Sequence, residues 1–278
     1  MAGRLEGKVA FITGAARGQG RSHALRLAQE GADIIAIDIC ERIPENTYDP
    51  ATEEDLAETV RQVEALDRRI VASKADVRDF DQVKGAVDDG VAQLGRLDVI
   101  SANAGIAGRP NRSEDIPDDE WRNMIDINLS GVWRTVKAAV PHIRAGGNGG
   151  SIILTSSDAG LFPYENISHY VSAKHGVVGL MRTLALELAP EFIRVNSVHP
   201  TTVDTPMVQN EGIYRLFRPD LSDPTKDDFA AAATTMNALP IPWVEALDIS
   251  NAVLFFASDE SRYVTGVPLA VDAGAAVK

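Results

Sequence analysis

The sequence predicts an α/β fold in which about seven parallel strands form one sheet with helices on both faces. Short apolar runs alternate with longer stretches of helical periodicity along the whole chain of 278 residues. This alternation is typical of strand–helix–strand units and of a parallel sheet that is covered on both sides. Because α/β folds of this length are commonly one domain, we expect residues 1–278 to form a single domain.

The same patterns give the elements in chain order. The predicted strands are residues 9–12, 33–37, 69–75, 97–101, 150–155, 192–198 and 268–272. The predicted helices are residues 22–30, 52–66, 79–94, 118–145, 168–189 and 247–257. We expect the ligand site at the carboxyl ends of the strands, because open α/β sheets bind ligands there.

The first strand leads into a glycine-rich turn. Gly14, Gly18 and Gly20 lie between the apolar run 9–12 and the first helical pattern. Glycine lets the backbone turn tightly and approach a ligand closely. The N–H groups and the positive dipole end of a helix N-terminus favour a pyrophosphate. The unit therefore predicts a dinucleotide site on a Rossmann-type, doubly wound sheet.

The expected cofactor is NAD. The second strand ends in Asp38, at about the distance from the glycine turn at which dinucleotide-binding folds have an acid for the ribose hydroxyls. The Asp38 carboxylate would repel the 2′-phosphate of NADP. Arg17 is the opposing signal, because a basic residue in the turn can bind that phosphate, but the acid at the ribose is the stronger one.

Ser157, Tyr170 and Lys174 indicate acid–base chemistry. Tyr170 and Lys174 are four residues apart in a predicted helix and share one face, and Ser157 lies thirteen positions before Tyr170. A phenol has a pKa of about 10, and one cation at about 4 Å in a half-buried site supplies roughly 4 kcal/mol. We therefore expect Lys174 to lower the pKa of Tyr170 by about three units. Tyr170 would take the proton of an alcohol as hydride leaves its carbon, while Ser157 steadies the developing carbonyl oxygen.

The chain resembles the short-chain dehydrogenases/reductases from Gly7 to Gly274. The motifs of this resemblance are Thr13-Gly14-x-x-x-Gly18-x-Gly20, Asp76-Val77, Asn103-Ala104-Gly105, Asn128, Ser157, Tyr170-x-x-x-Lys174 and Val203-x-Thr205, in the order and spacing of that family. The resemblance implies that Asn128, Ser157, Tyr170 and Lys174 are catalytic. Lys174 would also hold the nicotinamide ribose, and Asn128 would hold a water that carries protons onward.

The resemblance also implies a set of cofactor-binding residues. Asp76 and Val77 would flank the adenine, residues 103–105 would lie beneath the cofactor, and Val203 with Thr205 would meet the carboxamide. The full predicted set is Gly14, Ala16, Arg17, Gly18, Gln19, Gly20, Asp38, Ile39, Asp76, Val77, Asn103, Ala104, Gly105, Tyr170, Lys174, Pro200, Val203 and Thr205. One departure is Thr201, which follows Pro200 where many relatives have glycine. The sequence therefore does not predict the geometry of this loop.

Two segments lie outside the predicted strands and helices of the Rossmann-type sheet. Residues 39–51 are an irregular, proline-bearing insertion directly after Asp38, and we expect them over the adenosine half of the cofactor. The alternative is an ordinary solvated loop. Residues 206–242 are long enough for a lid or substrate loop. We expect about half of their large apolar side chains to be buried and the rest, with Phe162 and Tyr164, to form an apolar pocket.

The insertion and the passages 199–207 and 239–243 resemble more narrowly the mycofactocin-associated, carveol dehydrogenase-like branch. That resemblance implies an NAD that does not exchange readily and is recycled in place by mycofactocin, a separate redox partner. The predicted function is the interconversion of an apolar, terpenoid-like secondary alcohol and its ketone. Two alternatives stay open: a conventional enzyme with exchangeable NAD acting on a steroid or other secondary alcohol, and a catalytically idle NAD(H)-sensing protein.

The composition and the sequence pattern limit the kinds of partner that we expect for this protein. A formal net charge of −13 argues against nucleic acid and anionic membrane surfaces. The N-terminus lacks the apolar stretch of a signal peptide, so we expect a cytoplasmic protein. The five histidines lack partners at metal-ligand spacing, so no metal is expected. Past Lys174, apolar residues cover more than one stripe of the helix, and related enzymes pair this helix across a two-fold axis, which predicts a homotetramer.

Overall fold

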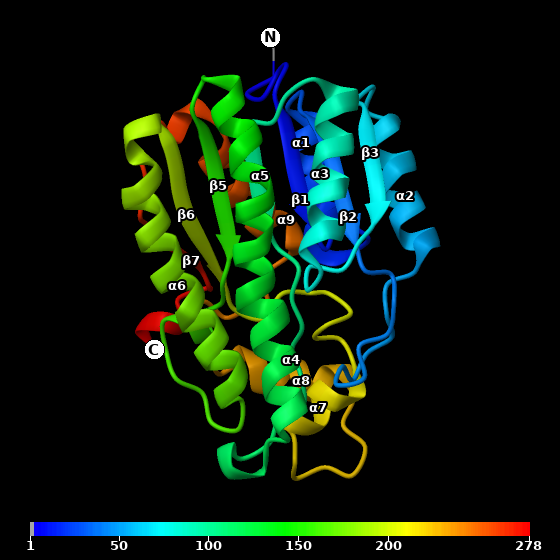
Figure 1. Cartoon of the computed structure of the whole chain (residues 1–278). Helices are drawn as coiled ribbons and strands as arrows, with labels where there is room; N and C mark the ends of the chain where they lie inside the picture. The colour runs from blue at the N-terminus through cyan, green and yellow to red at the C-terminus, as the bar shows by residue number, and fades with distance from the viewer. Residues whose placement is uncertain (1–2) are drawn as a thin grey trace.

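Seven parallel strands form one sheet in the order β3-β2-β1-β4-β5-β6-β7 (Figure 1). The structure, a computed structural model, describes residues 3–278. The strands are β1 (Val9–Thr13), β2 (Asp33–Asp38), β3 (Ile70–Lys74), β4 (Val99–Ala102), β5 (Gly150–Thr155), β6 (Ile193–Pro200) and β7 (Pro268–Val271). Each predicted strand is present, with bounds within two residues of the predicted ones. The predicted Rossmann-type α/β sheet is confirmed.

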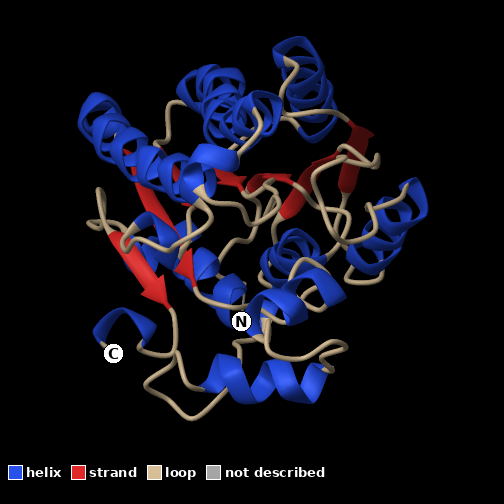
Figure 2. Ribbon diagram, turned by 90° about the horizontal axis from the view of Figure 1, so that it is seen from below, coloured by secondary structure: helices blue, strands red, loops and turns tan. Residues whose placement is uncertain are grey.

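Helices cover both faces of the sheet (Figure 2). One face carries α3 (Phe80–Leu94), α5 (Val132–Gly146) and α6 (Ser168–Leu188), and the other carries α1 (Gly18–Gln29), α2 (Glu53–Glu64) and α9 (Ala246–Ala257). Successive strand residues point to opposite faces, so Phe11 packs into the first layer and its neighbour Ile12 into the second. Both faces are buried, which is why the strand runs are apolar throughout.

The carboxyl ends of the strands lie at the lower end of the molecule in Figure 1. The segments outside the minimal fold gather beyond that edge: α4 (Asp118–Ile125), α7 (Glu211–Phe217) and α8 (Lys226–Thr234). The chain runs outward from β1 to β3 and then returns to the other side of β1 for β4. Ligand sites of open α/β sheets lie at such a switch point.

The predicted helix 118–145 contains an irregular turn. The helical stretch is continuous, but between α4 and α5 the backbone forms a π-helical turn at Asp126–Gly131 that the sequence pattern did not indicate. A Cβ at Gly131 would lie 2.8 Å from Cγ2 of Val77, which shows how closely the turn packs against the segment after β3. Such wide turns are frequent at functional sites, and this one contains the fully buried Asn128.

Two other segments differ from their predicted structure. Helix α1 begins at Gly18 rather than Ser22, because the glycines of its first turn hide the helical periodicity. Residues 206–242 contain two short helices, whose N-termini are capped by the side chains of Asn210 and Thr225. Both caps satisfy N–H groups that a helix start leaves without partners.

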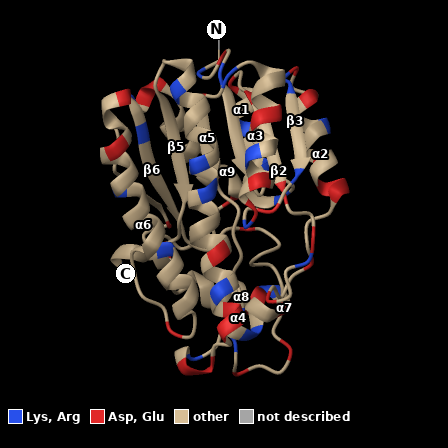
Figure 3. Ribbon diagram, in the orientation of Figure 1, with Lys and Arg blue, Asp and Glu red and all other residues tan. Residues whose placement is uncertain are grey.

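Charged residues occur along the helices and loops, whereas the strands carry few of them (Figure 3). Acidic and basic residues are interspersed on these surfaces, and many of them form exposed ion pairs, such as Arg61 with Glu58 and Arg144 with Glu191. Within residues 3–278, no helix combines the length and apolar character that crossing a membrane requires.

Candidate active site

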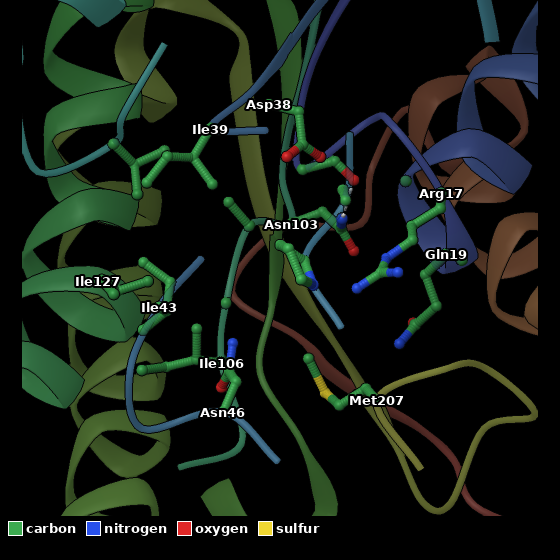
Figure 4. Close-up of a pocket in the computed structure, with 18 of the residues that line it drawn as sticks. Arg17, Gln19, Asp38, Ile39, Ile43, Asn46, Asn103, Ile106, Ile127 and Met207 are labelled. Atoms are coloured by element: carbon green, nitrogen blue, oxygen red, sulfur yellow. Dashed lines mark hydrogen bonds between the residues drawn. The ribbon is translucent and has the colours of Figure 1, made fainter. Parts of the chain in front are cut away.

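A cleft opens at the switch point of the sheet, beyond the carboxyl ends of β1, β2 and β4 (Figure 4). It is lined by thirteen of the predicted cofactor residues: Gly14, Arg17, Gly18, Gln19, Gly20, Asp38, Ile39, Asp76, Val77, Asn103, Ala104, Gly105 and Thr205. The lining does not include the other five predicted residues, Ala16, Tyr170, Lys174, Pro200 and Val203. Groups that are far apart in the sequence therefore meet in one site, as the fold class requires.

The glycine-rich turn requires glycine at two positions, for different reasons. Gly14 has a φ of +69°, a conformation that favours glycine. A Cβ at Gly20 would lie 1.9 Å from the carbonyl oxygen of Gly14, so no larger residue fits. In the described part of the chain, no side chain caps the N-terminus of α1, and its first turn contains no acidic residue. The N–H groups of this turn are available for a phosphate.

Asp38 is fixed at the end of β2 by two backbone N–H groups. Ala16 donates to Oδ2 at 3.0 Å and Cys40 donates to Oδ1 at 3.2 Å. Arg17, the opposing signal in the sequence, is engaged elsewhere: its guanidinium donates to the carbonyl oxygen of Asp49 and lies 5.7 Å from the ring centroid of Tyr48. The carboxylate of Asp38 is therefore fixed in the cleft, whereas the guanidinium of Arg17 is bound by the insertion.

The insertion 39–51 covers the cleft and is tied to distant parts of the chain. It contributes Ile43, Asn46, Tyr48, Pro50 and Ala51 to the lining. Its hydrogen bonds run from Arg109 Nη2 to Pro44 O (2.9 Å), from Asn123 Nδ2 to Glu45 Oε2 (2.8 Å), from Thr47 Oγ1 to Asn210 Oδ1 (2.9 Å) and from Arg17 to Asp49 O. The insertion is thus a packed strap across the cleft, which the alternative of a solvated loop does not describe.

The four predicted catalytic residues gather beside the cleft. Tyr170 and Lys174 lie on α6, and Ser157 follows β5, where its hydroxyl is close enough to Tyr170 to act on the pKa of the phenol. Lys174 Nζ donates to the carbonyl oxygen of Thr155 at 3.0 Å and lies 5.5 Å from the ring centroid of Tyr170. A Cβ at Gly105, on the cleft wall, would lie 3.6 Å from Lys174 Nζ and 3.2 Å from Asn128 Oδ1.

Asn128 uses its amide to hold the loop after β4. Its Oδ1 accepts from the N–H of Ile106 at 2.8 Å, and its Nδ2 donates to the carbonyl oxygen of the same residue at 2.8 Å. The predicted role of Asn128 in binding a water stays a prediction.

The prediction that Lys174 lowers the pKa of Tyr170 is wrong for the protein without a bound cofactor. Burial raises the pKa of Tyr170 to about 12, and the carboxylate of Asp158 adds to the rise, while the hydroxyl of Ser157 opposes it. Burial also lowers the pKa of Lys174 to about 8. The physical reason is that Tyr170 is partly buried against the core, so a phenolate there loses hydration. The ammonium of Lys174, which lies over the ring and donates to Thr155, does not offset that loss.

The other predicted cofactor residues make contacts with their neighbours in the protein. Val203 is buried and bridges to Val244, and a Cβ at Gly18 would lie 3.4 Å from Cγ2 of Thr205. The carboxylate of Asp76 pairs with Arg78, whose Nη2 lies 2.6 Å from Oδ2. Pro200 is the last residue of β6.

Sequence reasoning missed two kinds of site residue. The cleft is also lined by Ile106, Ile127 and Met207, apolar residues of loops and turns that carry no motif. His199 is buried beneath Ser157, and its Nδ1 lies 2.7 Å from the carbonyl oxygen of Ser157. Because a carbonyl oxygen only accepts, Nδ1 carries the proton, and burial lowers the pKa of His199 to about 4. His199 therefore fixes the backbone of the serine as a neutral donor. Among residues 3–278, no cluster of His, Cys, Asp and Glu is arranged to hold a metal ion.

The chain is similar over almost its whole length to known proteins. The family model for short chain dehydrogenases matches residues 8–213. The chain is 60% identical over 275 residues to (−)-trans-carveol dehydrogenase of Rhodococcus erythropolis, with 99% of each chain covered. The crystal structure of carveol dehydrogenase from Mycobacterium avium in complex with NAD matches with a TM-score of 0.99 and 63% identity, covering 99% of this chain and 100% of that one. A short chain dehydrogenase from Mycobacterium paratuberculosis bound to NAD matches with a TM-score of 0.90 and 50% identity, at 99% and 100% coverage.

Proposed function

The chain belongs to the short-chain dehydrogenase/reductase family, and its relatives support an NAD-dependent alcohol dehydrogenase. We propose that it interconverts an apolar, terpenoid-like secondary alcohol and its ketone. The proposal rests on Ser157, Tyr170 and Lys174, which lie together where β5 and α6 meet the cofactor cleft. The name of the Rhodococcus relative supports a cyclic terpenoid alcohol as the substrate type.

The residues of the cleft fit NAD. Gly14 and Gly20 leave the backbone open where a Cβ would fill the turn, and α1 offers uncapped N–H groups to a pyrophosphate. Asp38 stands where the ribose hydroxyls need an acceptor, and Arg17 is held by Asp49 rather than aimed at a 2′-phosphate. NAD, when bound, supplies the hydride acceptor.

The chain's own residues handle the proton and the oxygen. Tyr170 takes the hydroxyl proton of the alcohol, and Ser157 hydrogen-bonds the same oxygen while it becomes a carbonyl. Lys174 keeps a positive charge near the phenol, and its ammonium is held in place by the hydrogen bond to the carbonyl oxygen of Thr155. The positive charge of an oxidised nicotinamide adds to that of Lys174 and favours the phenolate further.

The substrate side is apolar and held by aromatic packing. In residues 206–242, all of which the structure describes, Phe229 is the one large apolar residue that is buried, so the expectation that half would be buried is wrong. The ring of Phe229 packs against Tyr214, Phe217 and Trp243, with centroids 5.3, 4.9 and 5.6 Å away. This cluster anchors the segment, and the other apolar side chains stay partly exposed beside the cleft, where they suit an apolar substrate.

The proposal extends to an NAD that is retained between turnovers and reoxidised in place by mycofactocin. Its support is the strap 39–51, which lines the cleft and is joined to α4, to the segment before α7 and to the glycine turn. Release of the cofactor requires these contacts to open together, so they slow its exchange.

Mass spectrometry of protein purified without added NAD, followed by an alcohol assay, tests both the retention of NAD and the substrate class. We expect NAD to accompany the protein, and (−)-trans-carveol or a related cyclic alcohol to be oxidised with an artificial electron acceptor. If the protein emerges empty and turns over freely with added NAD, retention fails while the dehydrogenase function stands. If no secondary alcohol in a panel of terpenoid, cyclohexyl and steroid alcohols is oxidised, the substrate proposal fails.

Arg109→Gln is expected to speed NAD release roughly tenfold. The variant removes a charged donor to the strap at Pro44, and a hydrogen bond of this kind is worth about 1.5–3 kcal/mol. Release can be followed as the loss of bound NADH fluorescence after mixing with excess NAD. Arg112→Gln is the matched control, because Arg112 is exposed and pairs with Glu114 outside the strap. Equal release rates in the two variants would contradict the role of the strap.

We also propose that the chain assembles as a homotetramer through α6. Leu186 near its C-terminal end is 80% exposed and Phe192 just beyond is 82% exposed, an arrangement that favours burial against another copy. Sedimentation should give a mass of four chains for the native protein and a smaller species for Leu186→Asp. Glu187→Gln, on the neighbouring exposed position, should leave the mass unchanged. A native protein that sediments as a monomer refutes the assembly.

A further inference from the structure

The strap 39–51 directs one side chain into the cleft, between two that bind other segments. The side chain of Glu45 accepts a hydrogen bond from α4, and that of Thr47 donates one to the residue that caps α7. Asn46, between them, lines the cleft, and its backbone N–H donates to the carbonyl oxygen of Ile43 at 3.1 Å. The two neighbours along the chain therefore hold Asn46 in place at the cleft.

The amide oxygen of Asn46 is a buried acceptor to which the described chain gives no donor. Among residues 3–278, Asn46 Oδ1 has no hydrogen-bond partner, and the same is true of Gln19 Oε1 in the first turn of α1. Both residues line the cleft (Figure 4). A buried acceptor that lacks a donor costs free energy, so a ligand that brings donors to these two oxygens recovers that cost.

Asn46 lies at the catalytic end of the cleft. In the view of Figure 4 it is on the side of Ile106, away from Asp38. Ile106 directly follows Gly105, where a Cβ would lie 3.6 Å from Lys174 Nζ. The groups that face Asn46 are therefore those next to the catalytic lysine, whereas the acid for the adenosine ribose is at the other end.

The neighbouring strap residue Tyr48 also reaches the catalytic groups. Burial raises the pKa of Tyr48, Arg17 opposes the rise, and Tyr170 adds to it. Since charges act on a pKa mainly at short range, Tyr48 lies near the catalytic tyrosine. The strap thus extends from the adenosine end, where the sequence places it, to the end at which hydride would be transferred.

The chemistry of the dinucleotide limits what Asn46 can bind. An amide oxygen accepts hydrogen bonds, and the ionised oxygens of a pyrophosphate also only accept. Beyond the pyrophosphate, the donors of NAD are the hydroxyls of the nicotinamide ribose and the N–H groups of the carboxamide. Both kinds of donor belong to the nicotinamide half.

We propose that Asn46 is a cofactor-binding residue whose Oδ1 accepts a hydrogen bond from the nicotinamide half of NAD. The strap then binds the cofactor directly, in addition to covering it. The inference rests on the proposed function, because it concerns the same NAD.

The test compares NADH with ADP, which lacks the nicotinamide half. Protein loaded with NADH is incubated with increasing ADP until the fluorescence of bound NADH is constant at each concentration. The displacement gives the ratio of the dissociation constant of ADP to that of NADH. No alcohol or ketone is present, so the inference can fail while the dehydrogenase function stands. If the native protein binds no NADH, the proposed cofactor is refuted, and with it this inference.

Asn46→Ala removes the acceptor. We expect NADH to bind about tenfold more weakly and ADP to bind as before, so that the ratio falls about tenfold, the size of one hydrogen bond. ADP-ribose identifies the donor. If its affinity falls with that of NADH, the donor is a ribose hydroxyl, and if its affinity stays, the donor is the carboxamide. A ratio of ADP to NADH within twofold of the native one would overturn the proposal.

Arg42→Ala is the matched control, because Arg42 is an exposed residue of the strap outside the lining. Its ratio should stay within about twofold of the native one. Asn46→Asp keeps an oxygen acceptor, and its charge repels ADP at least as strongly as NADH, because a terminal phosphate is the more negative group. The ratio in Asn46→Asp should therefore not fall, and a tenfold fall there contradicts the role of the acceptor.

Thermal melts separate cofactor binding from folding. In saturating ADP, Asn46→Ala should melt at the native temperature, and in saturating NADH it should melt below it, since a weaker ligand stabilises less. An equal decrease in both would show a structural role for Asn46 and count against the proposal. If Asn46→Ala does not fold, the ratio in Asn46→Asp still decides.

Discussion

Tyr170→Phe is expected to lower alcohol oxidation by about a thousandfold while NAD binding is retained. A positioned acid–base group contributes roughly 10²- to 10⁴-fold to a rate, and phenylalanine removes the hydroxyl while keeping the ring that packs in the core. The residues that line the cleft, which we propose hold the dinucleotide, are unchanged, because Tyr170 is not part of the lining. Steady-state rates and the NAD content of the purified protein measure the two quantities separately.

Tyr263→Phe is the matched control, because this tyrosine is 86% exposed and lies far from the site in the sequence. It should leave both the rate and the NAD content unchanged. A native protein that binds NAD and oxidises no alcohol at all would support the idle NAD(H)-sensing alternative, since there would be no turnover to lose. Full activity in Tyr170→Phe would show that another group takes the proton.

Gly20→Ala is expected to weaken NAD binding by roughly a hundredfold, or about 3 kcal/mol. The new Cβ would lie 1.9 Å from the carbonyl oxygen of Gly14 and 2.7 Å from its carbonyl carbon. Both are backbone atoms of the same turn, so the clash is relieved only by moving the N-terminus of α1 away from the cleft. Calorimetric titration of NAD measures the loss.

Gly85→Ala serves as the control for this substitution. Gly85 lies within α3, and a Cβ there would meet no atom within 4 Å. Alanine in a helix interior stabilises by about 0.5–1 kcal/mol relative to glycine, so this variant should bind NAD normally and melt at a slightly higher temperature. If Gly20→Ala and Gly85→Ala bind NAD with equal affinity, the glycine turn does not take part in NAD binding.

The parts of the fold that depend on local pattern were predictable. The strands follow apolar runs because both faces of the sheet are covered, and the glycine turn with Asp38 follows backbone requirements that act over a few residues. The spacing of Tyr170 and Lys174 was enough to bring them onto one face of α6. These features need no knowledge of what lies across the cleft.

The parts that depend on packing between distant segments were not predictable. The wide turn at Asp126–Gly131 forms where Gly131 meets Val77. The pKa of Tyr170 depends on how completely the phenol is enclosed, and the distance along a helix says nothing of that. The partners of the strap, Arg109 and Asn123, are more than sixty residues away along the chain. His199 carries no motif, and only the assembled site shows what it holds.

The bond between Thr47 and Asn210 has a consequence for exchanging parts between relatives. Asn210 also caps α7, and at Gly212 in the first turn of that helix a Cβ would lie 2.7 Å from the Cβ of Thr47. A graft of residues 206–242 from another enzyme, made to change which alcohol is accepted, would therefore collide with or detach the loop 39–51 unless both travel together. If the proposed roles of the two segments hold, a change of substrate range in this chain also changes how firmly the dinucleotide is retained.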